Sequence, residues 1–147
     1  MPPAVADPQL ECVVADWSAD RRDLERIRRA VFVEEQAIPE EDEWDDEDAG
    51  SVHVLALLNR DPVGTGRLNP AGKIGRIAVI AGQRGRGIGT QILLRLLDEA
   101  RRLGIREPCL HAQVQVVPFY EKLGFACRGE AFDEAGIPHV RMSLVLE

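Results

Sequence analysis

The chain has 147 residues, of which 45% are hydrophobic and 29% charged, and these proportions are typical of a globular protein with a single core. Its formal net charge of −7 argues against nucleic acid as a partner, because phosphate backbones are bound by basic surfaces. The three cysteines form no closely spaced pair, which argues against a disulfide framework or a zinc site and favours a cytoplasmic location, and no apolar run is long enough to cross a membrane.

The first third of the chain combines a strand, a helix and an acidic segment. Residues 1–9 are predicted to be a frayed tail, and residues 10–147 to form one domain. We expect a strand over Leu10–Ala15 and a helix over Ala19–Val33, where apolar residues recur at helical spacing. Residues 34–48 include ten acidic side chains. Because like charges at this density repel one another, we expect an exposed loop with at most a helical turn there.

The middle of the chain reads as a small sheet followed by a helix. Three strands, at Val52–Leu58, Val63–Leu68 and Lys73–Ile80, are predicted to form an antiparallel meander. The residues from Ile88 to Leu103 carry one apolar stripe at helical spacing, and a glycine follows as a stop signal.

The last third is predicted to hold a strand at Pro108–Ala112, a short helix at Val116–Leu123, and strands at Phe125–Cys127 and Pro138–Leu146 separated by a polar loop. When the helical turn of the acidic segment is counted as a second helix, the element order is β-α-α-β-β-β-α-β-α-β-β. It indicates a single α/β domain in which helices flank a mixed sheet.

The residues from Arg84 to Thr90 form a glycine-rich turn between an apolar run and the amphipathic helix. Gly85, Gly87 and Gly89 let the backbone approach a ligand that any Cβ would obstruct. The helix that follows presents unpaired N–H groups and a partial positive charge at its start. This arrangement predicts a cradle for phosphate oxygens, although glycines that only tighten a connection remain the alternative.

Two common phosphate motifs do not fit this turn. A Walker loop requires a lysine, and none is present in the turn. A dinucleotide fingerprint requires a third glycine where this chain has Thr90, and it opens a βαβ unit rather than following antiparallel strands.

A wider pattern does fit. Arg84-x-x-Gly87-x-Gly89, following the Ile77-Ala78-Val79 strand, resembles the acyl-CoA pyrophosphate motif of the GNAT N-acetyltransferase superfamily. Residues 118–125, Pro-Phe-Tyr-Glu-Lys-Leu-Gly-Phe, resemble the second signature of that superfamily, one strand further along. The resemblance extends from about residue 10 to the C-terminus. Within the superfamily, four segments look like the ElaA-like branch: residues 31–36, His53, residues 111–113 and residues 136–139.

The resemblance implies acetyl-CoA as co-substrate and no metal. Its pyrophosphate would be held by the residues of the turn, namely Arg84, Gly85, Arg86, Gly87, Ile88, Gly89 and Thr90. Its pantetheine arm would run along Ile77, Ala78 and Val79 as an additional strand, although these side chains alone indicate only a buried strand. Many relatives carry an asparagine where this chain has Gln113, whose longer amide can still reach the pantetheine.

Tyr120 matches the usual general acid of the family and would also contact the coenzyme. A phenol is protonated at neutral pH, so it can donate to a departing thiolate. The alternative is an amphipathic tyrosine that only packs on the core.

The general base has several candidates: Glu34, Glu35, His53, His111 and His139. We favour Glu34, because it lies in the first segment that resembles the family, where the acceptor side of the cleft is expected. A histidine on a strand is more often a satisfied core residue, and an ordered water that relays the proton is a further alternative.

The expected function is direct acetyl transfer from acetyl-CoA to a primary amine of a small molecule or peptide, by a monomer or homodimer. The acidic segment Glu40–Asp48 either rims the acceptor site, where it would attract a cationic amine, or is a solvated loop. The alternative function is a catalytically silent acyl-CoA-binding module that acts as a sensor or interaction domain.

Overall fold

The structure, a computed structural model, describes residues 9–147. The rest of the predicted tail lies outside the described residues, and Gln9 itself joins the fold, because its carbonyl accepts a 3.1 Å hydrogen bond from the Asn59 N–H. The strands are β1 (Leu10–Ala15), β2 (Val52–Leu58), β3 (Asp61–Leu68), β4 (Ile74–Val79), β5 (Cys109–Gln113), β6 (Ala126–Glu134) and β7 (Ile137–Ser143). The α-helices are α1 (Arg21–Arg28), α2 (Glu40–Glu43), α3 (Ile88–Arg102) and α4 (Val117–Lys122).

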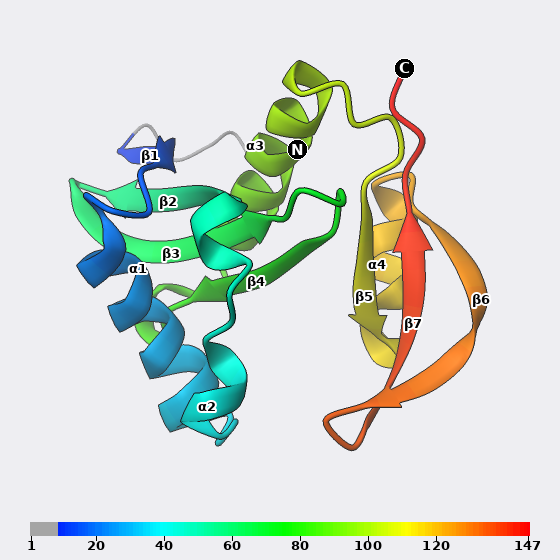
Figure 1. Cartoon of the computed structure of the whole chain (residues 1–147), viewed down its shortest axis with the longest axis horizontal. Coiled ribbons are helices and arrows are strands. Elements are labelled where there is room, and N and C mark those ends of the chain that lie inside the picture. The colour runs from blue at the N-terminus through cyan, green and yellow to red at the C-terminus, as the bar shows by residue number, and fades with distance from the viewer. Residues whose placement is uncertain (1–8) are drawn as a thin grey trace.

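The strands form two antiparallel sheets that stand side by side (Figure 1). One sheet has the order β1-β2-β3-β4 and the other the order β5-β7-β6. Within residues 9–147, the junction between the sheets is one parallel bridge, Lys73–Cys109, beside which the Cys109 N–H donates to the Gly72 carbonyl at 2.9 Å. The mixed α/β domain predicted from the sequence is confirmed, and β4 and β5 separate beyond this bridge.

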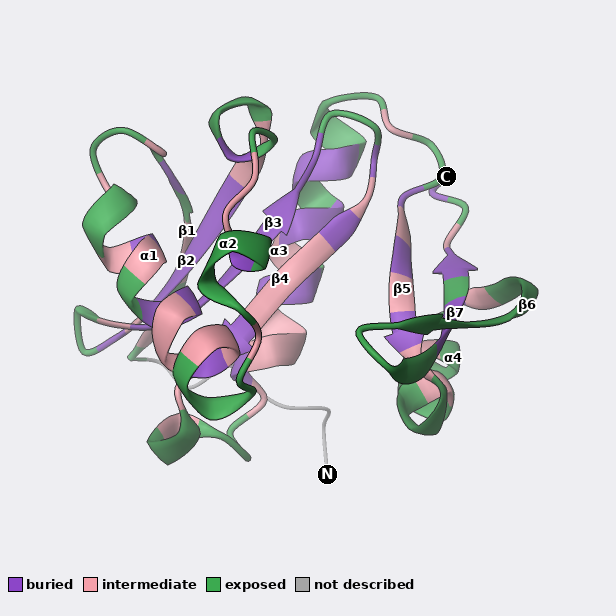
Figure 2. Cartoon of the chain, turned by 60° about the horizontal axis from the view of Figure 1, so that its bottom comes forward, coloured by how far each residue is buried: buried purple, intermediate pink, exposed green. Residues whose placement is uncertain are grey.

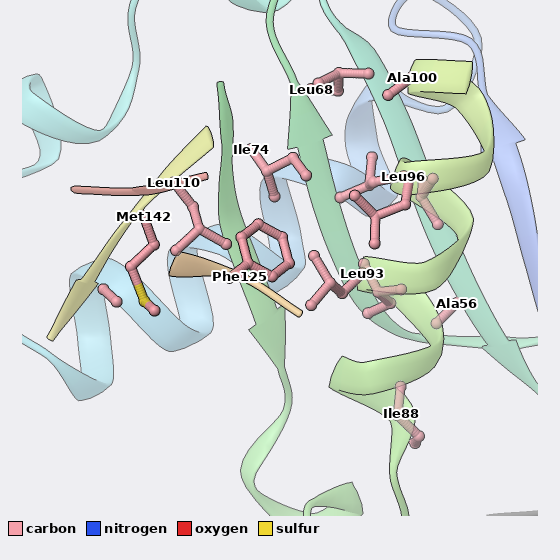
Figure 3. Packing of buried hydrophobic residues seen from close by; sticks show 14 of the residues in the cluster. Ala56, Leu68, Ile74, Ile88, Leu93, Leu96, Ala100, Leu110, Phe125 and Met142 are labelled. Carbon is pink, nitrogen blue, oxygen red and sulfur yellow. The ribbon is translucent and has the colours of Figure 1, made fainter. Parts of the chain in front are cut away.

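One hydrophobic core joins both sheets through helix α3. The apolar stripe of α3 is buried against the larger sheet, with Ile92 and Leu96 fully covered. Figure 3 shows Phe125 and Leu110 packing toward Leu93 of the same helix, so the smaller sheet shares this core. Each buried leucine or isoleucine contributes on the order of 1.5–3 kcal/mol relative to exposure, and α3 is therefore the element that holds the two sheets together.

Helix α1 covers the opposite face of the larger sheet. Its buried residues Leu24 and Ile27 pack with Leu55 of β2 and Ala78 of β4 in a second cluster. Figure 2 shows that β2 and β3 of the larger sheet are mostly buried and β4 mostly intermediate, while β6 is exposed along most of its length. Among the described residues no helix is both long and apolar enough to span a membrane.

Strand β4 contains a bulge at its centre. Thr65 pairs with Ala78 and Arg67 with Gly75, so β4 carries one residue more than β3 over this interval. Arg76 lies inside it with φ of +52°, a left-handed backbone conformation that is uncommon for a residue with a side chain. The extra residue twists β4 just where it separates from β5.

Two predicted elements differ from the structure. The helix predicted over Ala19–Val33 begins at Arg21 and continues past Arg28 as a π-helical segment, Arg29–Glu35. The polar loop predicted after Cys127 is instead strand β6, which continues to Glu134 before a tight turn into β7. The prediction failed because β6 is an edge strand that is exposed on both faces, so it lacks the alternation of apolar residues that identifies a half-buried strand.

A close contact between β3 and α3 predicts a strict requirement for glycine at position 66. A Cβ on Gly66 would lie 2.6 Å from Cγ2 of Ile92 and 2.9 Å from Cδ1 of Leu96. Gly66→Ala should therefore lower the free energy of unfolding in urea by about 1–3 kcal/mol, as overpacked core substitutions do. Gly75→Ala is the matched control, because a Cβ there meets nothing within 4 Å. Equal stability of the two variants would contradict this packing.

Candidate active site

A cavity of about 390 Å³ opens between the end of β4 and the start of α3. Nearly all the residues that the sequence predicted for coenzyme binding line it: Ile77, Ala78, Val79, Arg84, Gly85, Gly87, Ile88, Gly89, Thr90 and Tyr120. The other lining residues, for which the sequence predicted no part in coenzyme binding, are Val31, Gln36, Gln83, Leu93 and Phe119. We call this space the coenzyme cavity.

The glycine-rich turn adopts the backbone that its sequence indicates. Gly85 and Gly87 have φ of +83° and +77°, so both require glycine, and Gly87 immediately precedes the first residue of α3. Gly89 lies within the first turn of the helix, where an added Cβ would have only one contact, at 3.9 Å to Val79. The first backbone N–H groups of this 15-residue helix therefore face the cavity mouth without intrahelical partners.

The two arginines of the turn have different positions. Arg84 is anchored, because its Nε donates to the Val79 carbonyl at 2.9 Å and its Nη2 to Oε1 of Glu35 at 2.6 Å. Arg86 is exposed and does not line the cavity. Arg84 thus ties the end of β4 to the π-helical segment, while Arg86 projects into solvent.

A second cavity, of about 410 Å³, lies where β4 and β5 separate, and we call it the acceptor cavity. It shares Gln36, Ile77 and Tyr120 with the coenzyme cavity, so the two spaces meet around these residues. The polar and charged residues of its lining are Gln36, Glu43, Lys73, Arg76, His111, Gln113, Tyr120, Glu134 and His139. Gln113 therefore lies on the acceptor side of Tyr120, and not in the lining of the coenzyme cavity where it was expected.

Tyr120 occupies the junction of the two cavities. Its ring packs edge-on against Phe119 and Phe125, with centroids 5.2 and 5.8 Å away, and these contacts fix its orientation on α4. Burial raises the pKa of the phenol, which keeps it protonated at neutral pH. The Tyr120 side chain is thus a protonated hydroxyl group held at the junction of the two cavities.

The predicted base candidates occupy four different environments. Glu34 is exposed in a surface depression beside the arginines of α1, outside both cavities, so the structure does not bring it to the acceptor side. Glu35 is paired with Arg84. His53 is buried, stacks on Trp17 at 4.8 Å and has its Nε2 2.8 Å from the Asp48 carbonyl, so it is a structural residue. Only His111 and His139 line the acceptor cavity.

The acidic segment packs against the body of the protein through buried ion pairs. Arg28 is 1% exposed and contacts Oε2 of Glu43 and Oδ1 of Asp48, both at 2.7 Å. Arg67 contacts Asp45 and Asp48 at 2.8 Å. The expectation of a solvated, repelling loop is therefore wrong for these acids, because arginines on α1 and β3 compensate their charge.

Trp44 adds apolar contact to this network of ion pairs. The guanidinium groups of Arg28 and Arg29 lie over its ring, with their Cζ atoms 4.9 and 5.3 Å from the ring centroid. Among residues 9–147 no group of three or more metal-binding side chains is arranged to hold an ion. The network of ion pairs could not be predicted from the sequence, because each arginine lies far along the chain from the acidic residues that it contacts.

Comparisons with known proteins agree with this geometry. Residues 19–146 match the model of the acetyltransferase (GNAT) domain. The uncharacterized N-acetyltransferase YjcF of Bacillus subtilis is 36% identical over 90% of this chain and 98% of its own length. Protein ElaA of Escherichia coli is 32% identical over 82% of this chain and 84% of its own length.

Solved structures show the same fold. The crystal structure of Escherichia coli ElaA superposes with a TM-score of 0.81 at 28% identity, covering 92% of this chain and 99% of that one. An acyl-CoA N-acyltransferase from Pseudomonas aeruginosa superposes with a TM-score of 0.83 at 28% identity and the same coverage.

The glycine turn at the start of α3, the separated strands and the tyrosine between two cavities define an acyltransferase fold of the GNAT type. The chain belongs to the GNAT acetyltransferase family, and its similarity to ElaA in sequence and structure supports the ElaA-like branch.

The buried position of His53 predicts a pH-dependent stability. Burial lowers its pKa, outweighing the hydrogen bond and charge of Asp48 that raise it. Below about pH 6.5 the unfolded chain binds a proton at this imidazole that the folded chain does not, so stability falls as the pH falls. In urea unfolding at pH 7.5 and 5.5, wild type should lose more stability on acidification than His53→Gln, whose amide can still bond the Asp48 carbonyl. Equal losses would contradict a depressed His53 pKa.

Proposed function

We propose that this chain transfers an acetyl group from acetyl-CoA directly to a primary amine of a small molecule or peptide. The observation that carries the proposal is the meeting of two cavities at Tyr120. One cavity has the phosphate cradle expected for a coenzyme, and the other has the histidines and carboxylates suited to an amine. An acyl-CoA-binding sensor would need only the first cavity.

The coenzyme would lie across the start of α3 and along β4. The N–H groups of the first helical turn and the glycine backbone would hold the pyrophosphate, since both attract anions. β4 is the edge strand of its sheet, so its outer backbone groups can pair with an extended pantetheine arm at Ile77 and Val79. This seat would bring the thioester to the junction with the acceptor cavity.

Transfer then requires few groups. A neutral amine in the acceptor cavity attacks the thioester carbonyl, whose oxygen the backbone N–H of Val79 would stabilise. The C–S bond breaks as the new C–N bond forms, and the departing sulfur takes a proton from Tyr120. Holding both substrates at one junction supplies much of the rate acceleration, because the reaction becomes effectively unimolecular.

Coenzyme binding is tested by placing a negative charge in the cradle. Gly89→Glu fits the helix, because an added Cβ meets only Val79 at 3.9 Å and an acid is favourable in a first helical turn. It should nevertheless weaken acetyl-CoA binding in calorimetry by ~100-fold or more, a loss of about 3 kcal/mol, because the carboxylate occupies the phosphate site. Gly82→Glu adds the same charge outside the cavity, where a Cβ has no neighbour within 4 Å, and should bind normally. Unchanged affinity in Gly89→Glu would reject this seat.

The role of Tyr120 as general acid is tested by removing its hydroxyl group. Tyr120→Phe keeps the ring contacts with Phe119 and Phe125 but cannot donate a proton. We expect kcat for acetyl transfer to fall by ~100-fold or more, with acetyl-CoA affinity unchanged, because general acid catalysis typically contributes that much. A variant with wild-type kcat would exclude Tyr120 as the acid, and a wild type that binds acetyl-CoA but acetylates no amine would favour the sensor.

A further inference from the structure

Two histidines and a glutamate form a connected cluster on the side of the acceptor cavity that faces β4. Nδ1 of His111 on β5 lies 2.7 Å from Oε1 of Glu134 on β6, and Nε2 of His139 on β7 lies 3.7 Å from Oε2 of the same carboxylate. All three residues line the cavity that also contains Tyr120. The hairpin turn between β6 and β7 is what brings Glu134 over His111.

The hydrogen bonds of this cluster define which imidazole nitrogen can act. A carboxylate only accepts, so the Nδ1 of His111 must carry the proton that it shares with Glu134. In the neutral ring the lone pair then lies on Nε2, which no residue from 9 to 147 engages in a hydrogen bond. His139 differs, because its Nδ1 donates to the Ile137 carbonyl at 2.7 Å and its Nε2 faces Glu134.

We propose that His111 is the catalytic base that removes the proton from the acceptor amine, and that Glu134 is the residue that positions it. This inference rests on the proposed acetyltransferase function. His139 lies near the other oxygen of the Glu134 carboxylate, 3.7 Å from Oε2.

The exposures fit a proton relay. The side chain of His111 is 25% exposed and that of Glu134 46%, so an imidazolium formed in the cavity can release its proton to water. Burial of Glu134 would raise its pKa, but the hydrogen bond of His111 and the charges of His111, Lys73 and His139 together lower the pKa, so the carboxylate is ionised at neutral pH. An ionised carboxylate on Nδ1 stabilises the imidazolium and fixes the ring orientation.

The surroundings contain charges of both signs. Arg141 on β7 is the strand-register partner of His111 on β5, and it is exposed. The other ionisable groups that line the cavity are Glu43 from α2, Lys73 and Arg76 from the β4 side, and Tyr120 from α4. Glu43 lies 3.2 Å from Arg76 and 2.7 Å from Arg28, so its charge is compensated by these two arginines.

The transfer reaction balances with His111 as the base and Tyr120 as the acid. The acceptor enters as R–NH₃⁺, gives one proton to Nε2 of His111 and attacks the thioester through its lone pair. The N–C bond forms, the C–S bond breaks, and the sulfur takes the Tyr120 proton. The second nitrogen proton restores the phenol, while His111 releases its proton to water. The sum is R–NH₃⁺ and acetyl-CoA giving the amide, coenzyme A thiol and one proton.

Two probe amines of similar size separate a base from a structural residue. Benzylamine is an ammonium ion at pH 7, whereas aniline is already neutral. His111→Gln should lower kcat/KM for benzylamine by ~100-fold or more at pH 7, lower that for aniline far less, and leave acetyl-CoA affinity in calorimetry unchanged. Imidazole added to His111→Ala should restore part of the benzylamine rate. Equal losses for both amines, or no loss for either, would overturn the assignment.

Glu134→Gln tests the positioning role. It should displace the ascending limb of the benzylamine pH–rate profile to lower pH, because the negative charge that stabilises the imidazolium is lost. Glu130→Gln is the matched control on β6, exposed and outside the cavity lining, and should leave the profile unchanged. A profile that Glu134→Gln does not move would remove Glu134 from the mechanism.

A third measurement needs neither amine nor coenzyme. Long-range ¹H–¹⁵N spectra of the free wild-type chain at pH 8 should show His111 with the proton on Nδ1 and none on Nε2. A proton on Nε2 would overturn the proposal even if neither probe amine is acetylated. Failure of the wild type to bind acetyl-CoA would instead count against the acetyltransferase function.

Discussion

The architecture of the site depends on how Arg76 is held in the middle of β4. Its left-handed backbone conformation costs about 1–3 kcal/mol for a residue with a side chain. The compensation comes from the acidic segment, because the Arg76 guanidinium lies 3.2 Å from the buried Glu43 carboxylate and donates to the Glu43 carbonyl at 3.1 Å. Glu43 is itself fixed by Arg28 of α1. A buried ion network therefore supports the bulge at the point where β4 leaves β5.

This separation creates the acceptor cavity, and the helices complete both sites. β4 contributes its outer edge to the coenzyme cavity and its bulge to the acceptor cavity. The N-terminus of helix α3 lines the coenzyme cavity as the proposed phosphate cradle, while the apolar stripe of the helix holds the two sheets in one core. Tyr120 reaches the junction because α4 packs its ring against Phe125. Under the proposed function, the same elements that stabilise the domain would position the two substrates around Tyr120.

Local signals in the sequence were sufficient for much of this structure. The strand at Leu10–Ala15 and the strand at Val52–Leu58 were predicted with the observed limits, because their apolar residues mark them clearly. The glycine turn and Tyr120 were identified because backbone conformation and motif spacing are written in adjacent residues. Both line the coenzyme cavity in the structure, and their chemical roles stay predictions.

The features that the sequence did not predict depend on contacts between distant residues. Glu43 and Asp48 carry no local sign that Arg28 and Arg67 will cover them. Glu134 was assigned to a loop because an exposed edge strand lacks a regular alternation of apolar residues. Its contact with His111 joins β6 to β5 across the intervening strand β7. A local pattern can identify a helix or a turn, whereas partners for buried charge emerge only from the folded topology.

The most direct measurement is a crystal structure of this chain with acetyl-CoA bound. We expect the pyrophosphate on the backbone of Gly85–Thr90, the pantetheine arm along β4 at Ile77–Val79, and the thioester sulfur within hydrogen-bonding distance of the Tyr120 hydroxyl. A coenzyme bound elsewhere, or one whose sulfur lies away from Tyr120 and the acceptor cavity, would contradict this expectation.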